Sequence, residues 1–182
     1  MIRGIFQLFD TENQNGRIYP RDVLLPEIMR YKKEYVDTGR AFGELDHPDG
    51  PEINGDRICH RIVDLWVEGN AVWGKSLVLN TTKGKEVQAM LDDGGVMGVS
   101  SRALGEVDAN SQVYDMRLIC WDVVHEPSVA VALMEKINEK KTYDLKKFLE
   151  TEKKQYEQLK KINSADEGKM LVELKRLLSK RI

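Results

Sequence analysis

Residues 58–79, which read ICHRIVDLWVEGNAVWGKSLVL, decide the fold. Two apolar runs, 58–67 and 72–79, flank the polar turn Glu68-Gly69-Asn70 and are rich in Ile, Val and Trp. β-Branched and aromatic residues on both sides of a short turn that contains glycine predict a β-hairpin. Strands joined at this distance run antiparallel, because parallel neighbours need a crossover between them. The hairpin therefore favours an antiparallel sheet or barrel over a parallel sheet.

The segments around the hairpin add further strands and two short helices. Strand-like segments cover residues 2–9, 96–104 and 112–124. A surface helix of about ten residues is expected to begin at Pro26, because proline suits the first helical position. A second helix is expected to begin at Thr81 or Thr82, either of which can cap it. We therefore expect an α+β body with at least five strands and two helices.

The composition is that of a folded chain without a membrane segment. The 182 residues are 41% hydrophobic and 32% charged, which suits one domain with or without an appendage and excludes a wholly disordered chain. No apolar run approaches the ~18 residues of a membrane span, and no signal-peptide pattern is visible, so we expect a soluble protein that is not secreted. Cys59 and Cys120 alone supply neither a disulfide framework nor a four-thiolate metal site.

The charge is distributed unevenly along the chain. Residues 135–182 hold 14 of the 28 basic and 9 of the 30 acidic residues, a net +5, whereas residues 1–134 hold the other 14 and 21, a net −7. Leucine stripes at helical spacing accompany this change, so we predict a body over 1–134 and a basic, amphipathic helical tail over 135–182. A charge of +5 spread over two such helices is typical of a solvated face, and we expect no specific nucleic-acid partner.

The chain has three histidines, and each has a different local sequence. His47 lies in the loop-forming stretch 43–50, GELDHPDG, where Pro48 disfavours helix, so we expect this ring at the surface. His60 lies inside the predicted hairpin, where a packed or hydrogen-bonded ring is the usual arrangement. His125 stands at the end of a predicted strand, and we interpret it as structural in the same way.

Two adjacent serines, in the stretch 98–102 (GVSSR), raise the question of nucleophilic catalysis. A serine nucleophile needs a base and a group that orients the base. His47 is a possible base, and Asp122 is a carboxylate in an otherwise apolar strand. A salt bridge from Asp122 to Arg102 or Arg117 explains that carboxylate equally well at this point.

A metal site is a weaker hypothesis. Asp46, His47 and Asp49 are possible ligands, but neighbouring residues of one loop rarely complete a coordination shell. We therefore expect neither a metal nor a cofactor.

Several sequence blocks between about residues 2 and 130 resemble the prohead core proteases of myovirus-type tailed bacteriophages, a family of serine proteases related to herpesvirus assemblin. The blocks are GIF at 4–6, NGRIYP at 15–20, GELDHP at 43–48, the hairpin segments DLW at 64–66 and VWG at 72–74, and GVSSR at 98–102. The resemblance implies an assemblin-like fold, which is a closed antiparallel β-barrel surrounded by helices.

The resemblance also implies roles for individual residues. In this family a histidine, a serine and a third residue follow one another along the chain, an order that His47, Ser100 and Asp122 share. His47 is then the general base and Ser100 the nucleophile. Asp122 is the third member, with Glu126 as its competitor. Supporting roles fall to two further residues: Ser101 in the turn and Arg102 either beside the oxyanion or paired with an acid.

The implied function is capsid maturation. Such a protease works inside the prohead core of the assembling virion in the host cytoplasm, as a homo-oligomer, and cuts scaffold and major capsid proteins after a glutamate preceded two residues earlier by Leu or Ile. Matching triplets make Glu135, Glu139 and Glu173 candidate self-cleavage sites. The alternative is a structural or scaffolding protein of the prohead core that kept the fold without activity.

Overall fold

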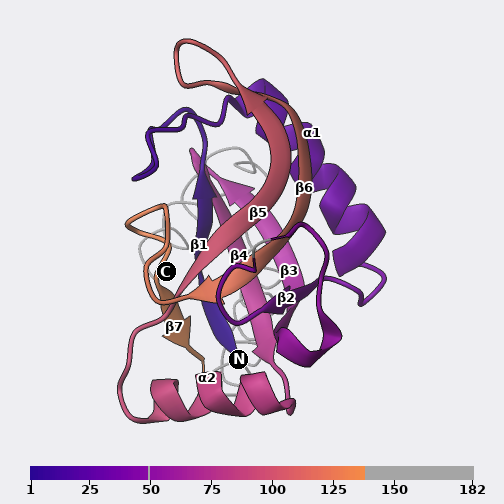
Figure 1. The fold of residues 1–182 in the computed structure, drawn as a ribbon, viewed down its shortest axis with the longest axis vertical. Helices are drawn as coiled ribbons and strands as arrows, with labels where there is room; N and C mark the ends of the chain where they lie inside the picture. Colours follow the sequence, from indigo (N-terminus) through magenta and orange to yellow (C-terminus); the bar gives the residue numbers. More distant parts are fainter. Residues whose placement is uncertain (49, 138–182) are drawn as a thin grey trace, which may run out of the picture. The chain divides into compact units, whose positions relative to one another are not determined.

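The computed structural model describes residues 1–48 and 50–137, which form seven strands and two α-helices within the unit Met1–Ile137 (Figure 1). The strands are β1 (Ile2–Leu8), β2 (Phe42–Glu44), β3 (Ile58–Glu68), β4 (Ala71–Val78), β5 (Gly98–Val107), β6 (Val113–Val124) and β7 (Met134–Lys136). The helices are α1 (Arg21–Tyr31), which continues into a π-helical turn over Lys32–Val36, and α2 (Thr82–Asp92); a 3-10 turn covers Gly55–Arg57.

The predicted hairpin is confirmed as β3 and β4, which pair antiparallel at the centre of a five-stranded sheet ordered β2-β3-β4-β1-β7. Gly69 has φ +61° in the turn, a conformation that glycine adopts without steric cost. Trp66 and Trp73 are cross-strand partners with ring centroids 6.3 Å apart, and the Arg3 guanidinium lies 5.4 Å from each ring. This stack fixes the hairpin register against β1.

The second sheet is the long antiparallel pair β5 and β6, the expected third strand pair. Figure 1 shows it as a curved ribbon in front of the five-stranded sheet, with α1 alongside β6. Within residues 1–48 and 50–137 the strands form these two sheets and not the expected closed barrel. Single bridges join the sheets at both edges, from Leu45 to Val123 and from Gly98 to Leu133. The edge strands β2 and β7 have only three residues each, too few for continuous pairing across either gap.

The core lies between the two sheets and α1. Trp121 of β6 is fully buried, and its ring packs edge-on against Phe6 and Tyr31 at centroid distances of 5.5 and 5.4 Å. Leu24, Ile28 and Tyr31 give α1 its buried face. Aromatic edge contacts of this kind add about 0.5–1.5 kcal/mol to the area that each ring buries. The Trp121 cluster therefore ties β1, α1 and β6 together behind the site.

The two helices agree only partly with prediction. The Thr81 hydroxyl accepts a hydrogen bond of 3.0 Å from the Gly84 amide, which confirms the predicted cap of α2. Helix α1 begins at Arg21, five residues before the predicted start. Pro26 therefore lies inside the helix, where its nitrogen cannot donate to the carbonyl four residues earlier.

The predicted boundary at residue 134 falls inside a strand. β7 pairs with β1, so Glu135 and Lys136 belong to the sheet and not to a helical tail. The tail from residue 138 onward, including Glu139 and Glu173, lies outside the described residues. In the described part of the chain, no helix is long and apolar enough to cross a membrane.

Candidate active site

The site is built around a hydrogen bond between His47 and Asp122. The chain leaves β2 at Glu44 and turns at Asp46, which has φ +59°, before the loop carries His47 toward β6. His47 Nδ1 lies 2.8 Å from Asp122 Oδ2, and the histidine side chain is 41% exposed while the aspartate is fully buried. Because Nδ1–H donates to the carboxylate, the lone pair of the neutral ring is on Nε2. Nε2 of the neutral ring is therefore able to accept a proton.

Asp122 is held by donors from three other residues. Its Oδ1 accepts hydrogen bonds from the Glu44 amide at 2.9 Å, Arg102 Nη2 at 3.1 Å and Cys120 Sγ at 3.4 Å, and Arg102 Nε lies 3.0 Å from Oδ2. Burial alone would raise the pKa of Asp122. The hydrogen bonds from His47 and the Glu44 amide, together with the charge of Arg102, outweigh burial and lower that pKa. The carboxylate is therefore ionised at neutral pH.

Ser100 lies on β5 directly opposite Asp122 in the β5–β6 register. It is 5% exposed, and its Oγ shares a hydrogen bond of 3.2 Å with Ser128 Oγ. Among the described residues no hydrogen bond joins Ser100 to His47. The structure thus brings His47 and Asp122 into contact and places Ser100 on the adjoining strand.

Ser128 is a neighbour of the site that sequence reasoning missed. It lies 28 positions after Ser100, in the irregular segment between β6 and β7. Its carbonyl also accepts a hydrogen bond of 2.8 Å from the Gln14 amide. A serine in a loop carries no local pattern that points to a contact at such separation.

The two candidate supporting residues differ in their surroundings. Ser101 is half-buried and pairs with Trp121 in the ladder, so it faces the opposite side from Ser100. Arg102 is 9% exposed and binds two acids, Asp122 and Glu44, as well as the carbonyls of Gly50 and Glu52 at 3.1 and 2.9 Å. The guanidinium is therefore engaged in pairing with acids, one of its two expected roles.

Among the described residues, none of the remaining candidates is hydrogen-bonded to the His47 ring. His60 is fully buried, its Nε2–H donates to the Trp121 carbonyl at 2.9 Å, and burial lowers its pKa. His125 is exposed and its Nδ1 is 3.1 Å from Asp46 Oδ1. Glu126 is exposed, so Asp122 and not Glu126 contacts His47. Arg117 pairs with Glu34 at the surface, 3.6 Å away.

Two of the three hypothetical metal ligands, Asp46 and His47, lie within the described residues. Among the described residues no group of three His, Cys, Asp or Glu side chains could hold a metal ion. Asp49, one of the three hypothetical ligands, lies outside the described residues.

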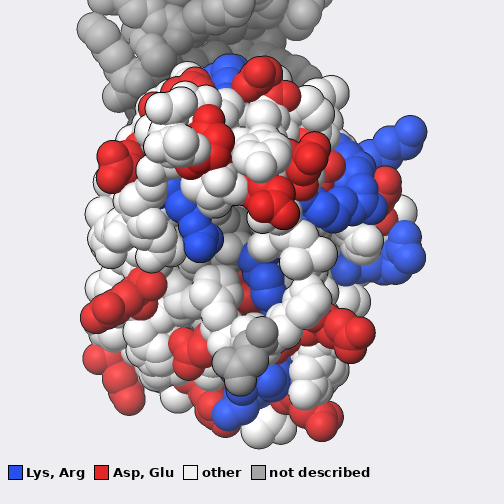
Figure 2. All heavy atoms as spheres, turned by 45° about the horizontal axis from the view of Figure 1, so that its top comes forward, with Lys and Arg blue, Asp and Glu red and all other residues white. Residues whose placement is uncertain are grey.

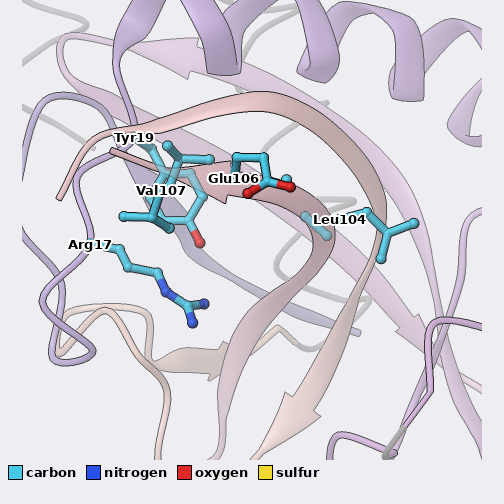
Figure 3. A pocket seen from close by; sticks show the side chains of 8 residues that line it. Arg17, Tyr19, Leu104, Glu106 and Val107 are labelled. Carbon is cyan, nitrogen blue, oxygen red and sulfur yellow. The ribbon is translucent and has the colours of Figure 1, made fainter. Parts of the chain in front are cut away.

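An open pocket of about 230 Å³ lies farther along β5 (Figure 3). Its lining comes from the second half of β5, from Val113, and from Arg17 and Tyr19 of the loop before α1. The same loop reaches the Ser128 carbonyl through Gln14, so one segment contacts both the pocket and the neighbourhood of Ser100. Figure 2 shows acidic and basic side chains interspersed over one face of the described body.

Comparisons with known proteins agree on one family. The sequence model of the family described as prohead core protein serine protease matches residues 1–160. The prohead core protein protease of Enterobacteria phage T4 is 34% identical over 115 residues, which are 62% of this chain and 54% of that protein. The chain thus spans about half the length of this curated relative. The structure of the bacteriophage T4 capsid assembly protease is similar with a TM-score of 0.64 and 32% identity, covering 67% of this chain and 79% of that one.

Proposed function

Because the chain belongs to the prohead core protein serine protease family, we propose that it is a serine endopeptidase of prohead maturation. Its substrates are the scaffold and major capsid proteins, its place is inside the assembling prohead in the host, and it acts as a homo-oligomer. The observation that carries the proposal is the 2.8 Å hydrogen bond between His47 and a buried Asp122, with Ser100 opposite Asp122 on the neighbouring strand.

The proposed chemistry gives one role to each of the three side chains. Ser100 Oγ attacks the scissile carbonyl while His47 Nε2 takes its proton, and the buried Asp122 carboxylate stabilises the imidazolium that forms. Ser100 must first rotate from Ser128 toward His47. Such rearrangements are common when substrate enters a site, and catalytic hydrogen bonds often tighten only in the complex.

Cleavage after glutamate, with Leu or Ile two residues earlier, is part of the same proposal. Glu135, Glu139 and Glu173 are then self-cleavage sites. Glu135 is exposed but lies in β7, opposite Arg3 of β1. A protease binds its substrate as an extended strand, so β7 must leave the sheet before it can be cut.

The test is to incubate purified protein with a mixture of peptides that contain glutamate and to sequence the cut ends. We expect cuts after glutamate by the wild type and none by Ser100→Ala. Intact-mass spectrometry on stored protein should show species that end at one of the three glutamates, while Ser100→Ala keeps its full length. Wild type that cuts neither peptides nor itself would favour the alternative, an inactive scaffolding protein.

A further inference from the structure

Glu44 is a buried carboxylate that the proposed reaction does not use. It is fully buried, and its two oxygens accept from the Asn54 amide at 2.8 Å, Arg57 Nε at 3.0 Å and Arg102 Nη2 at 3.1 Å. Its own amide donates to Asp122. Glu44 is therefore linked to Asp122 in two ways. Its backbone amide donates to the carboxylate directly, and its side chain shares the Arg102 guanidinium with it.

Arg102 stands between two carboxylates and shares one positive charge with both. Its Nη2 is 3.1 Å from Glu44 Oε1 and 3.1 Å from Asp122 Oδ1. The positive charge of Arg102 partly cancels the negative potential that the Asp122 carboxylate produces at the His47 ring. Glu44 offsets the cation, and Arg57 at the partly exposed end completes the row of alternating charges.

The other titratable groups around Asp122 are buried and uncharged at neutral pH. Burial raises the pKa values of Cys59, Cys120 and Tyr31, and it lowers that of His60. Asp46, which precedes His47 in the chain, pairs with His125, and both of these side chains are exposed. Solvent screens that exposed pair, so the electrostatic potential at the imidazole is set mainly by the row of Asp122, Arg102, Glu44 and Arg57.

We propose that Glu44 is a positioning residue for the His47–Asp122 pair, which holds Arg102 in place and offsets its charge so that Asp122 can stabilise the imidazolium. The inference rests on the proposed function for its catalytic consequence, but the coupling between Glu44 and His47 is a property of the folded protein. The proposal predicts that substitutions of Glu44 and of Arg102 have opposite effects on the protonation of His47. Glu44→Gln removes the compensating anion and disfavours protonated His47, whereas Arg102→Met removes the competing cation and favours it.

The first experiment measures kcat and KM from pH 5 to 9 on the best-cut peptide. We expect Glu44→Gln to lower kcat about 10-fold with KM nearly unchanged, and to move the acid limb of the profile to lower pH by about one unit. Arg102→Met should move the limb to higher pH, and the double variant should return it toward the wild-type position. Glu126→Gln, which removes an exposed acid that follows His125 in the chain, is the control and should leave the profile in place.

The second experiment follows the His47 ring by NMR titration in the Ser100→Ala background, where no turnover is needed. The midpoints should move in the same opposite directions. Unchanged midpoints, or movement of both variants in one direction, would overturn the positioning role even if the protein is a protease. Conversely, shifted midpoints in a protein that cuts no peptide would uphold the coupling and reject the proposed function.

Glu44→Asp covers the case in which Glu44→Gln does not fold. It keeps the charge and shortens the side chain by one methylene, so we expect a lower kcat with the acid limb within a few tenths of a unit of wild type. A kcat equal to that of wild type in this variant would contradict the proposal.

Discussion

The rim of the site and the interior behind it each hold a histidine, and adjacent residues of β6 bind them. Asp122 accepts from His47 at the rim, and the Trp121 carbonyl accepts from His60 in the interior. Strand β2 lies beside both, since Gly43 pairs with His60 in the sheet and the chain continues to His47. A Cβ on Gly43 would collide with the His60 ring and the Trp121 carbonyl, so glycine permits this close approach.

The two histidines differ in the charge of their hydrogen-bond partners and in their exposure to solvent. His47 is 41% exposed and its Nδ1 lies 2.8 Å from an anion, so the ring has both access to solvent and a charged partner. His60 is fully buried against a neutral carbonyl, and among the described residues its Nδ1 has no hydrogen-bond partner. A buried imidazole without an anion stays neutral and cannot exchange its proton readily. Surroundings, and not residue type, make one ring suited to catalysis and the other to packing.

The largest expected effect is a loss of cleavage from a substitution at the rim that leaves the stability of the interior unchanged. Ser100→Ala should reduce cleavage about 1,000-fold or more while the melting temperature stays close to that of wild type, because the proposed nucleophile is lost without a large cavity. Ser101→Ala faces away from His47 and should keep measurable activity. A dead Ser101→Ala beside an active Ser100→Ala, with both folded by circular dichroism, would reverse the assignment.

Asp122→Asn should make the hydrogen-bond partner of His47 neutral, as the partner of His60 already is. We expect cleavage to slow about 100-fold or more, because an amide neither stabilises the imidazolium nor fixes the required tautomer. Steady-state kinetics with Glu126→Gln as the matched control measures the effect. Equal losses in the two variants would argue against a specific role for Asp122.

His60→Ala tests the interior alone. Loss of a fully buried ring and its hydrogen bond to Trp121 should lower the free energy of unfolding by about 2–4 kcal/mol. Activity per folded molecule should change little under conditions where the variant is folded. Urea denaturation checks the first expectation, and a large loss of activity in fully folded His60→Ala would show that the two regions are not separable.

The smallest effect concerns the pH dependence of stability. Burial lowers the folded-state pKa of His60, so the unfolded chain binds a proton that the folded chain does not once the pH falls below about 6.5. The free energy of unfolding should therefore decrease by up to about 1.4 kcal/mol per pH unit between pH 6 and 5. Asp122, whose pKa is also lowered, adds a further loss only as the pH falls through its unfolded value near 4.

Urea titrations at pH 7, 6 and 5 on wild type and His60→Gln measure this term. The variant lacks the titrating ring, so its stability should vary less over the range. Parallel curves for the two proteins would contradict the assignment of the slope to His60.

Local sequence patterns predicted the parts of this molecule that short-range physics controls. The hairpin over residues 58–79 follows from β-branched runs around a turn, and the cap at Thr81 follows from hydroxyl chemistry. The surface placement of His47 follows from the loop residues around it. In each case the decisive interactions join neighbours in the chain.

The parts that could not be predicted depend on contacts between distant residues. Glu44 meets Asp122 across 78 positions, and Ser100 meets Ser128 across 28. Periodicity carries no information on such pairs. The two separate sheets were missed for a similar reason, because whether short edge strands close a barrel depends on their geometry and not on their pattern.

The edge strand β7 would control the rate of the proposed self-cleavage at Glu135. The Ile137 amide donates to the Met1 carbonyl at 2.7 Å, and Met134, Glu135 and Lys136 pair with β1. If closing is fast, the rate of cutting there equals the fraction of molecules with an open edge multiplied by the rate at which an open edge is cut. Deuterium uptake by these amides would report that open fraction directly. Pairing of β7 with β1 would then set the time before cleavage. A partner that covers β7 would lengthen this time, and one that detaches β7 would shorten it.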